Sequence, residues 1–342
     1  MRSATMLLQT KVEQTENQSI IHHHDPLILI GSCFAEKIGN RLLRSKFHCS
    51  VNPMGTLYNP FSIALCIKRI LSKEPFTPTE LHEFPGEGWG SWLHHSRYSR
   101  PTINEAIDIM NSQLEDAITI LDKNCTLIIT FGTAWIYRLR EDDTVVGNCH
   151  RQPDNLFKRN LLSIDDIITL WSPLLEQLQA TYPNLNIIFT VSPIRHLRDG
   201  AHANQLSKAT LLLAIDRLLT KLDYSHFQQN HSLSYFPAYE ILLDELRDYR
   251  FYADDMAHPS ALAEEYIWER FCNSYMDVST RNIITRWKEI EQALAHRPFR
   301  PNSNEYRHFI RQTLLKIETI QKEFPYFDIS NEINQCHTLL NN

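Results

Sequence analysis

Short apolar runs alternate with amphipathic segments along most of the chain. Continuous apolar runs at 27–30, 126–131 and 186–191 predict strands buried on both faces, and shorter strands are expected at 48–51 and 233–236. Apolar residues at helical spacing predict helices between these strands, at 33–45, 61–71, 103–121, 163–180, 203–221 and 238–246, and a further helix after Ser260.

Alternating strands and helices predict an α/β fold, in which a parallel sheet is covered by helices on both faces. The strands at 27–30, 126–131 and 186–191 all end in small or turn residues, which should therefore line one edge of the sheet. Beyond residue 275 the pattern predicts two amphipathic helices, 279–295 and 304–323, as a helical hairpin. We therefore expect a main domain over 1–275 and a helical extension over 276–342.

Two segments between these elements are less regular. Residues 84–100 are dense in glycine and aromatic residues, which is typical of an irregular loop or a hairpin. Residues 136–148 contain short β runs around a charged turn and predict a hairpin.

Composition and charge exclude several classes of protein. The chain is 43% hydrophobic with a net charge of −6, which gives no basic field for nucleic acid. No apolar run approaches the roughly 18 residues of a membrane span, and the N-terminus lacks a secretory signal pattern. Seven scattered cysteines without a C-x-x-C pair indicate neither a zinc site nor a disulfide framework. We expect a cytoplasmic protein that uses no metal or other cofactor, with the His22–His24 run in a loop.

Ser32 lies where the first buried strand meets a helix, in "PLILIGSCFAEKIGNRLL". A serine at this position is commonly a helix cap. It could instead be a nucleophile, because ligands commonly bind at the carboxyl edge of open α/β sheets.

A partner for such a nucleophile occurs late in the chain, in "FYADDMAHPS". Asp255 and His258 are three residues apart in a loop before a helix, so the carboxylate can fold back and orient the imidazole. An oriented histidine can take a proton from serine and pass it to a leaving group. The pair could also be no more than surface charge beside a proline turn.

The early serine and late Asp-x-x-His resemble the SGNH, or GDSL-like, hydrolase superfamily. "GSCFAEKIG" resembles the signature of the GSCFA family, and similar segments are "NPMGTLYNP", "FGTAWIY", "NCHRQP" and "SPIRHLRDG". The resemblance covers roughly residues 25–275. It implies a three-layer flavodoxin-like fold and an esterase-type or acyl-transfer site.

The resemblance also implies roles for individual residues. Ser32 resembles the nucleophile, and Asp255 and His258 resemble the acid and base of a triad. The amides of Ser32 and Gly55 resemble two oxyanion donors, and glycine permits the close approach that a backbone donor needs.

One position departs from the superfamily, which usually offers an asparagine in a Gly-x-Asn segment as a third oxyanion donor. Ala134 occupies that position here and has no side-chain donor. Thr133, Asn148 and His150 are the candidate replacements, although Asn148 and His150 could merely close a turn.

Other residues admit two interpretations. Cys33 could be the nucleophile if a helix N-terminus lowers its pKa, or it could pack as a small apolar residue. Arg195 and His196 could bind an anionic substrate group, or could be solvated residues before a helix. Trp89 could stack on a sugar or acyl group, or could fix its loop to the domain.

Together with the resemblance, these patterns predict a serine hydrolase that acts on an oxygen ester, and the resemblance to the superfamily implies small acyl esters, including acetyl groups on carbohydrates, as substrates. Its partners would be small esters or acylated carbohydrates, without nucleic acid or membrane. The alternative is a catalytically weak module on the same fold that binds a glycan or a protein partner.

Overall fold

The central sheet is parallel and has a doubly wound strand order. The computed structural model describes residues 10–13, 21–123, 125–223 and 233–341. Within these residues five parallel strands pair in the order β10-β9-β5-β1-β2. They are β1 (Leu27–Gly31), β2 (Cys49–Val51), β5 (Thr126–Phe131), β9 (Asn186–Val191) and β10 (Leu233–Phe236). Counted along the chain, this is the 2-1-3-4-5 order of flavodoxin-type sheets, and the predicted parallel α/β fold is confirmed.

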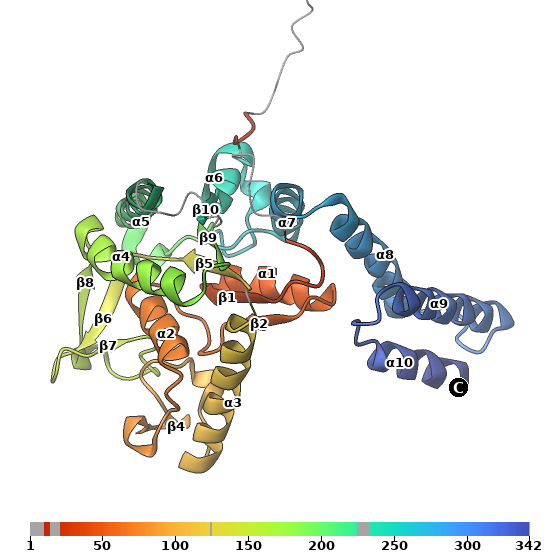
Figure 1. Ribbon diagram of the computed structural model, residues 1–342, viewed down its shortest axis with the longest axis horizontal. Coiled ribbons are helices and arrows are strands. Elements are labelled where there is room, and N and C mark those ends of the chain that lie inside the picture. Colours follow the sequence, from red (N-terminus) through yellow and green to blue (C-terminus); the bar gives the residue numbers. More distant parts are fainter. Residues whose placement is uncertain (1–9, 14–20, 124, 224–232, 342) are drawn as a thin grey trace, which may run out of the picture.

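Helices cover both faces of this sheet (Figure 1). Successive strand residues point to opposite faces, so Leu27 and Leu29 belong to one core cluster and Ile28 and Ile30 to the other. The first cluster includes residues of α1 (Cys33–Arg44), α6 (Ala238–Glu240) and α7 (Ala261–Tyr275). The second includes residues of α2 (Pro60–Ser72), α3 (Ile103–Leu121), α4 (Ile164–Thr181) and α5 (Gly200–Asp223).

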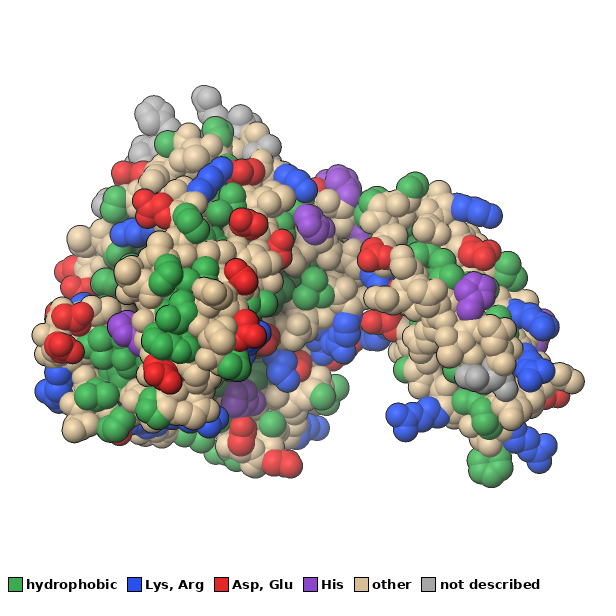
Figure 2. Space-filling view, turned by 90° about the horizontal axis from the view of Figure 1, so that it is seen from below, with side chains coloured by type: hydrophobic (Ala, Val, Ile, Leu, Met, Phe, Trp, Pro, Cys, Tyr) green, Lys and Arg blue, Asp and Glu red, His purple; other side chains and the backbone are tan. Residues whose placement is uncertain are grey.

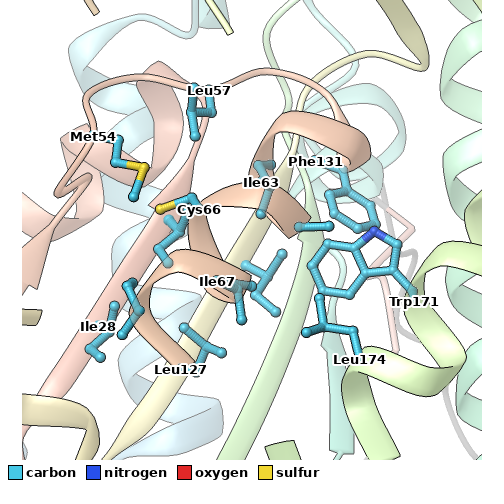
Figure 3. Packing of buried hydrophobic residues seen from close by; sticks show 14 of the residues in the cluster. Ile28, Met54, Leu57, Ile63, Cys66, Ile67, Leu127, Phe131, Trp171 and Leu174 are labelled. Atoms are coloured by element: carbon cyan, nitrogen blue, oxygen red, sulfur yellow. The ribbon is translucent and has the colours of Figure 1, made fainter. Parts of the chain in front are cut away.

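The larger core cluster joins the strands to α2 and α4. Figure 3 shows Ile63 and Ile67 of α2 packed against the strands, and Trp171 of α4 between Phe131 and Leu174. Phe131 meets Trp171 edge to face, with ring centroids 5.1 Å apart. The Trp171 indole nitrogen also donates to the carbonyl of Pro60, at 3.2 Å, so its polar atom is satisfied inside the core.

Two smaller sheets lie outside the central one. The glycine-rich segment contains an antiparallel hairpin, β3 (His82–Phe84) with β4 (Gly88–Gly90). The predicted hairpin at 136–148 is confirmed as β6 (Trp135–Leu139) and β7 (Val145–Val146). β8 (Phe157–Leu161), which the sequence did not indicate, pairs with β6 as a third strand. Short 3-10 turns occur at Pro78–Glu80, Ser96–Tyr98, Asp154–Leu156, Leu197–Asp199 and Tyr249–Phe251.

The predicted helix at 238–246 is not regular. Its first turn, α6, is α-helical, and the chain then continues as a π-helical turn over Ile241–Glu245. This wider turn places Glu245 in the interior, where its carboxylate pairs with Arg270 of α7 at 2.6 Å. Pairing with a buried carboxylate gives a physical reason for the local departure from α-helical geometry.

The C-terminal extension contains three helices in the described part of the chain, not the expected two. α8 (Val278–Ala295) packs antiparallel to α9 (Asn304–Glu323), since Arg286 pairs with Glu323 and Lys316 with Glu289. α10 (Ser330–Asn341) completes a separate core cluster with them. Figures 1 and 2 show this unit projecting from one side of the α/β domain. No helix among the described residues is both long and apolar enough to span a bilayer.

The C-terminal unit is fastened to the domain by aromatic and polar contacts near the end of α1. The indole nitrogen of Trp287 donates to the carbonyl of Arg44 at 2.8 Å. Lys46 forms an ion pair with Glu332 at 2.7 Å. These contacts join α8, through Trp287, and α10, through Glu332, to the end of α1 and the turn after it, so the extension packs against the domain as well as on itself.

Gly31 lets the end of β1 approach β5 closely. Its φ angle is +149°, a region that favours glycine, and its amide donates to Oδ1 of Asn52 at 2.8 Å. A Cβ atom at this position would lie only 2.2 Å from the carbonyl oxygen of Thr130. The strand-to-helix junction therefore requires a residue without a side chain.

We expect Gly31→Ala to lower the free energy of unfolding by about 3 kcal/mol or more, because it adds a backbone clash to an unfavourable φ. Gly86→Ala is the matched control, since Gly86 also has positive φ, at +79°, but a Cβ there meets no heavy atom within 4 Å. The control should lose only about 1–2 kcal/mol. Chemical denaturation measures both variants, and equal losses would contradict the close approach.

His94 is a histidine enclosed in the core. Its ring meets those of Phe76 and Tyr98 edge to face, with centroids 4.6 and 5.6 Å away. Neither ring nitrogen has a hydrogen-bond partner among the described residues. Burial lowers the pKa of His94 to about 3, so the folded protein keeps this imidazole neutral where an unfolded chain would protonate it.

Between about pH 6.5 and pH 3 the unfolded chain therefore binds one more proton at His94 than the folded chain, and stability should fall as pH falls. We expect His94→Phe to reduce this slope by up to about 1.4 kcal/mol per pH unit. Denaturation series at several pH values measure the slope. An unchanged slope in the variant would show that His94 is not held neutral.

Candidate functional site

Ser32 caps α1 at the carboxyl end of β1. Its backbone is extended, and its Oγ accepts a hydrogen bond from the amide of Phe34 at 3.2 Å. The residue is only 1% exposed. The capping interpretation is confirmed, and this contact does not test the nucleophile interpretation.

The position of Ser32 in the sheet is that expected of a ligand site. The strand order reverses between β1 and β5, and Ser32 follows the first of these strands while Gly132 follows the second. The loop after β2 fills the space between them. Its Leu57 amide donates to the carbonyl of Gly31, and its Tyr58 carbonyl accepts from the amides of Gly132 and Thr133, at 2.7–2.9 Å.

His196 approaches Ser32 across Gly132. A Cβ atom built on Gly132 would lie 3.3 Å from Ser32 Cβ and 3.5 Å from His196 Nε2. This Nε2 atom is buried and has no hydrogen-bond partner among the described residues. Burial, with the nearby positive charge of Lys208, lowers the pKa of His196 to about 4, so the imidazole is neutral at neutral pH. Arg195 and His196 were both predicted to bind an anionic group. Of the two side chains, only that of His196 reaches Gly132.

Lys208 of α5 lies beneath the same edge and was not predicted. Its ammonium donates to the carbonyls of Gly132, at 2.7 Å, and Ser192, at 2.6 Å. Burial lowers its pKa to about 7. The sequence did contain a signal: Lys208 precedes Leu211 and Ile215 at spacings of three and seven, which places it on the buried face of α5.

Asp255 and His258 form the predicted local pair. Asp255 Oδ2 is 2.5 Å from His258 Nδ1, and its Oδ1 accepts from the amides of Ala257 and His258, both at 2.9 Å. These bonds, led by the His258 amide, lower the pKa of Asp255 to about 2. The carboxylate is therefore ionised at neutral pH and fixes a proton on Nδ1, which leaves Nε2 as the acceptor.

The loop that carries this pair docks at the same sheet edge. The amide of Arg195, four residues after the end of β9, donates to the carbonyl of Ala257 at 3.0 Å. The Arg195 guanidinium lies over the ring of Tyr252, 4.4 Å from its centroid. No hydrogen bond joins His258 to Ser32 in the described structure, and both members of the pair are partly exposed.

The two backbone amides expected to bind an oxyanion are engaged. The amide of Ser32 donates to the carbonyl of Thr130 at 3.3 Å, and that of Gly55 to the carbonyl of Asn52 at 2.7 Å. Asn52 was not predicted as a site residue. Its Oδ1 holds the Gly31 amide, while its buried Nδ2 has no partner within the described chain.

The hydrogen bonds of the proposed third donors point elsewhere. The ring nitrogens of His150 are bonded to Glu87 and to the carbonyl of Ser91, at 2.9 and 3.0 Å, and the ring stacks on Phe84. Asn148 Oδ1 accepts from the amide of His150, which closes the turn. Both ring nitrogens of His150 therefore already have partners, and its role as a third oxyanion donor stays a prediction.

Three other candidates have structural contacts. The hydroxyl of Thr133 bonds with that of Ser207 at 3.0 Å and accepts from the amide of Trp135, so it is not free either. Cys33 Sγ is 3.2 Å from the hydroxyl of Tyr58. Trp89 bridges to Arg100 and packs against the core, which favours the loop-fixing interpretation. Across the described residues, no group of three or more His, Cys, Asp or Glu side chains could hold a metal ion.

Family models match both parts of the chain. The model of the GSCFA family matches residues 26–271, which include β1, the loop after β2, and the Asp255–His258 pair. The model described as "GSCFA domain protein, C-terminal domain" matches residues 287–342. No curated protein and no solved structure matches the chain. Since the first match covers well over half of the sequence, the chain belongs to the GSCFA family.

Proposed function

We propose that this protein is a serine esterase of the SGNH, or GDSL-like, type, which cleaves small acyl esters. Ser32 is the nucleophile, His258 the general base and acid, and Asp255 the group that orients His258. The observation that carries the proposal is the short Asp255–His258 contact, on a loop bonded to the segment after β9. That segment follows a strand of the same parallel sheet as β1, the strand that Ser32 follows, which supports pairing His258 with Ser32.

Each residue has one task in the reaction. His258 Nε2 takes the proton of Ser32 as Oγ attacks the acyl carbon, and the ester carbonyl becomes an oxyanion. His258 then gives that proton to the leaving alkoxide, which yields an acyl-enzyme and a free alcohol. A water molecule, or an acceptor alcohol, attacks the acyl group in a second cycle with the same base.

The order of the proposed catalytic residues along the chain supports the SGNH assignment. The proposed nucleophile follows the first strand of the sheet, and the Asp-x-x-His pair precedes the last helix of the domain. Small acyl esters are the proposed substrates, with acetyl groups on carbohydrates among them. Since Ser32 is 1% exposed, the side chains around it have to move before an acyl group can reach Oγ.

The buried serine and the engaged amides of Ser32 and Gly55 favour a second candidate, a catalytically weak module that binds a glycan or a protein partner. A fluorophosphonate probe separates the two functions, because it labels only an activated serine. Labelling that is lost in Ser32→Ala supports the esterase, and absence of labelling supports the binding module.

Ser32→Ala should abolish hydrolysis of 4-nitrophenyl acetate above the background rate, because it removes the nucleophile. Ser260→Ala is the matched control, since Ser260 also caps a helix and accepts from the amide of Ala263. Both variants should lose about 1 kcal/mol of stability from the missing cap. Ester turnover and denaturation are measured together, and retained turnover in Ser32→Ala would place the nucleophile elsewhere.

Asp255→Asn should lower turnover less than His258→Ala does. The histidine transfers the proton, which contributes about 100–10,000-fold, whereas the carboxylate orients it and stabilises its charged form. The comparison is of kcat/KM for the same aryl ester. A larger loss in Asp255→Asn would mean that the bonds from Asp255 to the amides of Ala257 and His258 matter more than the orientation of the imidazole.

A further inference from the structure

The candidate site needs a donor that the family resemblance does not provide. Ala134 has no donor in its side chain, the hydroxyl of Thr133 is bonded to Ser207, and His150 is bonded to Glu87 and Ser91. A preorganised donor aimed at the oxyanion contributes strongly to ester cleavage. A suitable group would be a buried N–H, close to Ser32, with no partner in the resting protein.

His196 meets these conditions. Its Nε2 lies 3.5 Å from the point at which a Cβ on Gly132 would sit, Ser32 Cβ lies 3.3 Å from the same point, and the carbonyl oxygen of Tyr58 lies 3.0 Å from it. The hydrogen-bearing face of Gly132 therefore lies between the serine and the imidazole, beside the Tyr58 carbonyl. Nε2 is buried there and has no hydrogen-bond partner within the described residues. A small group placed over Gly132 would contact both side chains.

The ring of His196 contacts one aromatic neighbour, and its backbone is tied to α5. The ring of Tyr58 meets the imidazole edge to face, with centroids 5.8 Å apart and planes at 90°. Its own backbone amide donates to Oδ1 of Asn204 in α5, at 3.0 Å. A ring fixed in this way can present a donor without first having to be ordered.

The charges around His196 keep it neutral. Burial has the largest effect and lowers the pKa of His196 to about 4; Lys208 and Arg159 also disfavour the imidazolium, whereas Asp199 and the backbone of Gly132 favour it. Asp199 is itself paired with Arg159 at 2.6 Å, which reduces its influence on the ring. A neutral imidazole carries one N–H, and it can polarise a carbonyl without giving up its proton.

We propose that His196 donates a hydrogen bond from Nε2 to the oxyanion formed when Ser32 attacks an ester, in place of the side-chain donor that Ala134 lacks. This inference rests on the proposed esterase function. As the bond between Ser32 Oγ and the acyl carbon forms, the carbonyl π pair moves to the oxygen and His258 takes the serine proton. His196 stabilises the new negative charge and remains protonated on Nε2 throughout.

The test compares 4-nitrophenyl acetate with the matching thionoester, in which sulfur replaces the carbonyl oxygen and accepts hydrogen bonds weakly. His196→Ala should lower kcat/KM about 100–1,000-fold for the oxygen ester and much less for the thionoester, because one oxyanion donor is lost. His258→Ala should lower both substrates alike. Loss of oxygen selectivity is a result that a merely structural role for His196 would not produce.

A second variant separates a donor from a base. His196→Gln keeps a neutral N–H near the position of Nε2 but cannot take a proton, so it should recover at least tenfold of the lost oxygen-ester turnover. Recovery and thermal stability close to wild type support the inference. Equal losses for both esters, with no recovery in His196→Gln, would make His196 a base or a structural residue and overturn it.

Two further results are decisive. Loss of oxygen selectivity in Asn52→Leu but not in the His196 variants would assign the donor to the unpaired Nδ2 of Asn52 and overturn the inference. If His196→Ala does not fold, the test rests on His196→Gln. A His196→Gln variant that has a normal thermal transition, but less than a tenth of the turnover of Asn52→Leu, would also count against the inference. Wild-type protein with no turnover that depends on Ser32 would overturn the esterase proposal itself, whereas normal turnover in His196→Ala would overturn only this inference.

Discussion

The contact between Gly31 and the backbone of Thr130 is the constraint on which the candidate site depends. A side chain at Gly31 would collide with the Thr130 carbonyl, so only glycine allows β1 and β5 to remain paired up to their ends. Ser32 and Gly132 then emerge from adjacent strands, at the point where the strand order reverses. The loop after β2 is bonded to both ends through Leu57 and Tyr58, and this fixes the remaining side of the site.

Polar groups beneath that edge are unusual for the interior of an α/β domain. The amino group of Lys208 donates hydrogen bonds to the carbonyls of Gly132 and Ser192. These two bonds hold the ends of β5 and β9 together. In a region with little water, a charge acts more strongly on its neighbours than it does at the surface. The same burial keeps His196 neutral and lowers the pKa of Lys208 to about 7, so two nitrogen donors of reduced basicity flank Gly132. Such a surrounding is suited to stabilising negative charge on a bound group.

The C-terminal helices form a unit with its own core, attached at the end of α1 and not at the sheet edge that carries Ser32. Trp287 serves both purposes, since its ring lies in the helical core and its indole nitrogen bonds the domain. The first family match ends at 271, within the last turns of α7, and the second begins at 287, in the middle of α8. The unit therefore adds a surface to the domain without contributing the residues proposed for catalysis.

Much of this arrangement could be predicted from the sequence because it is encoded locally. Buried strands are apparent as continuous apolar runs, helix periodicity recurs over three or four residues, and the Asp255–His258 contact joins residues only three apart. Contacts between residues that are far apart in the sequence became apparent only in the tertiary structure. Glu87 binds the ring of His150 across 63 positions of the chain, and Lys208 donates to the carbonyl of Gly132 across 76. A polar side chain has several possible partners of similar chemistry, and packing alone selects the one that is buried beside it.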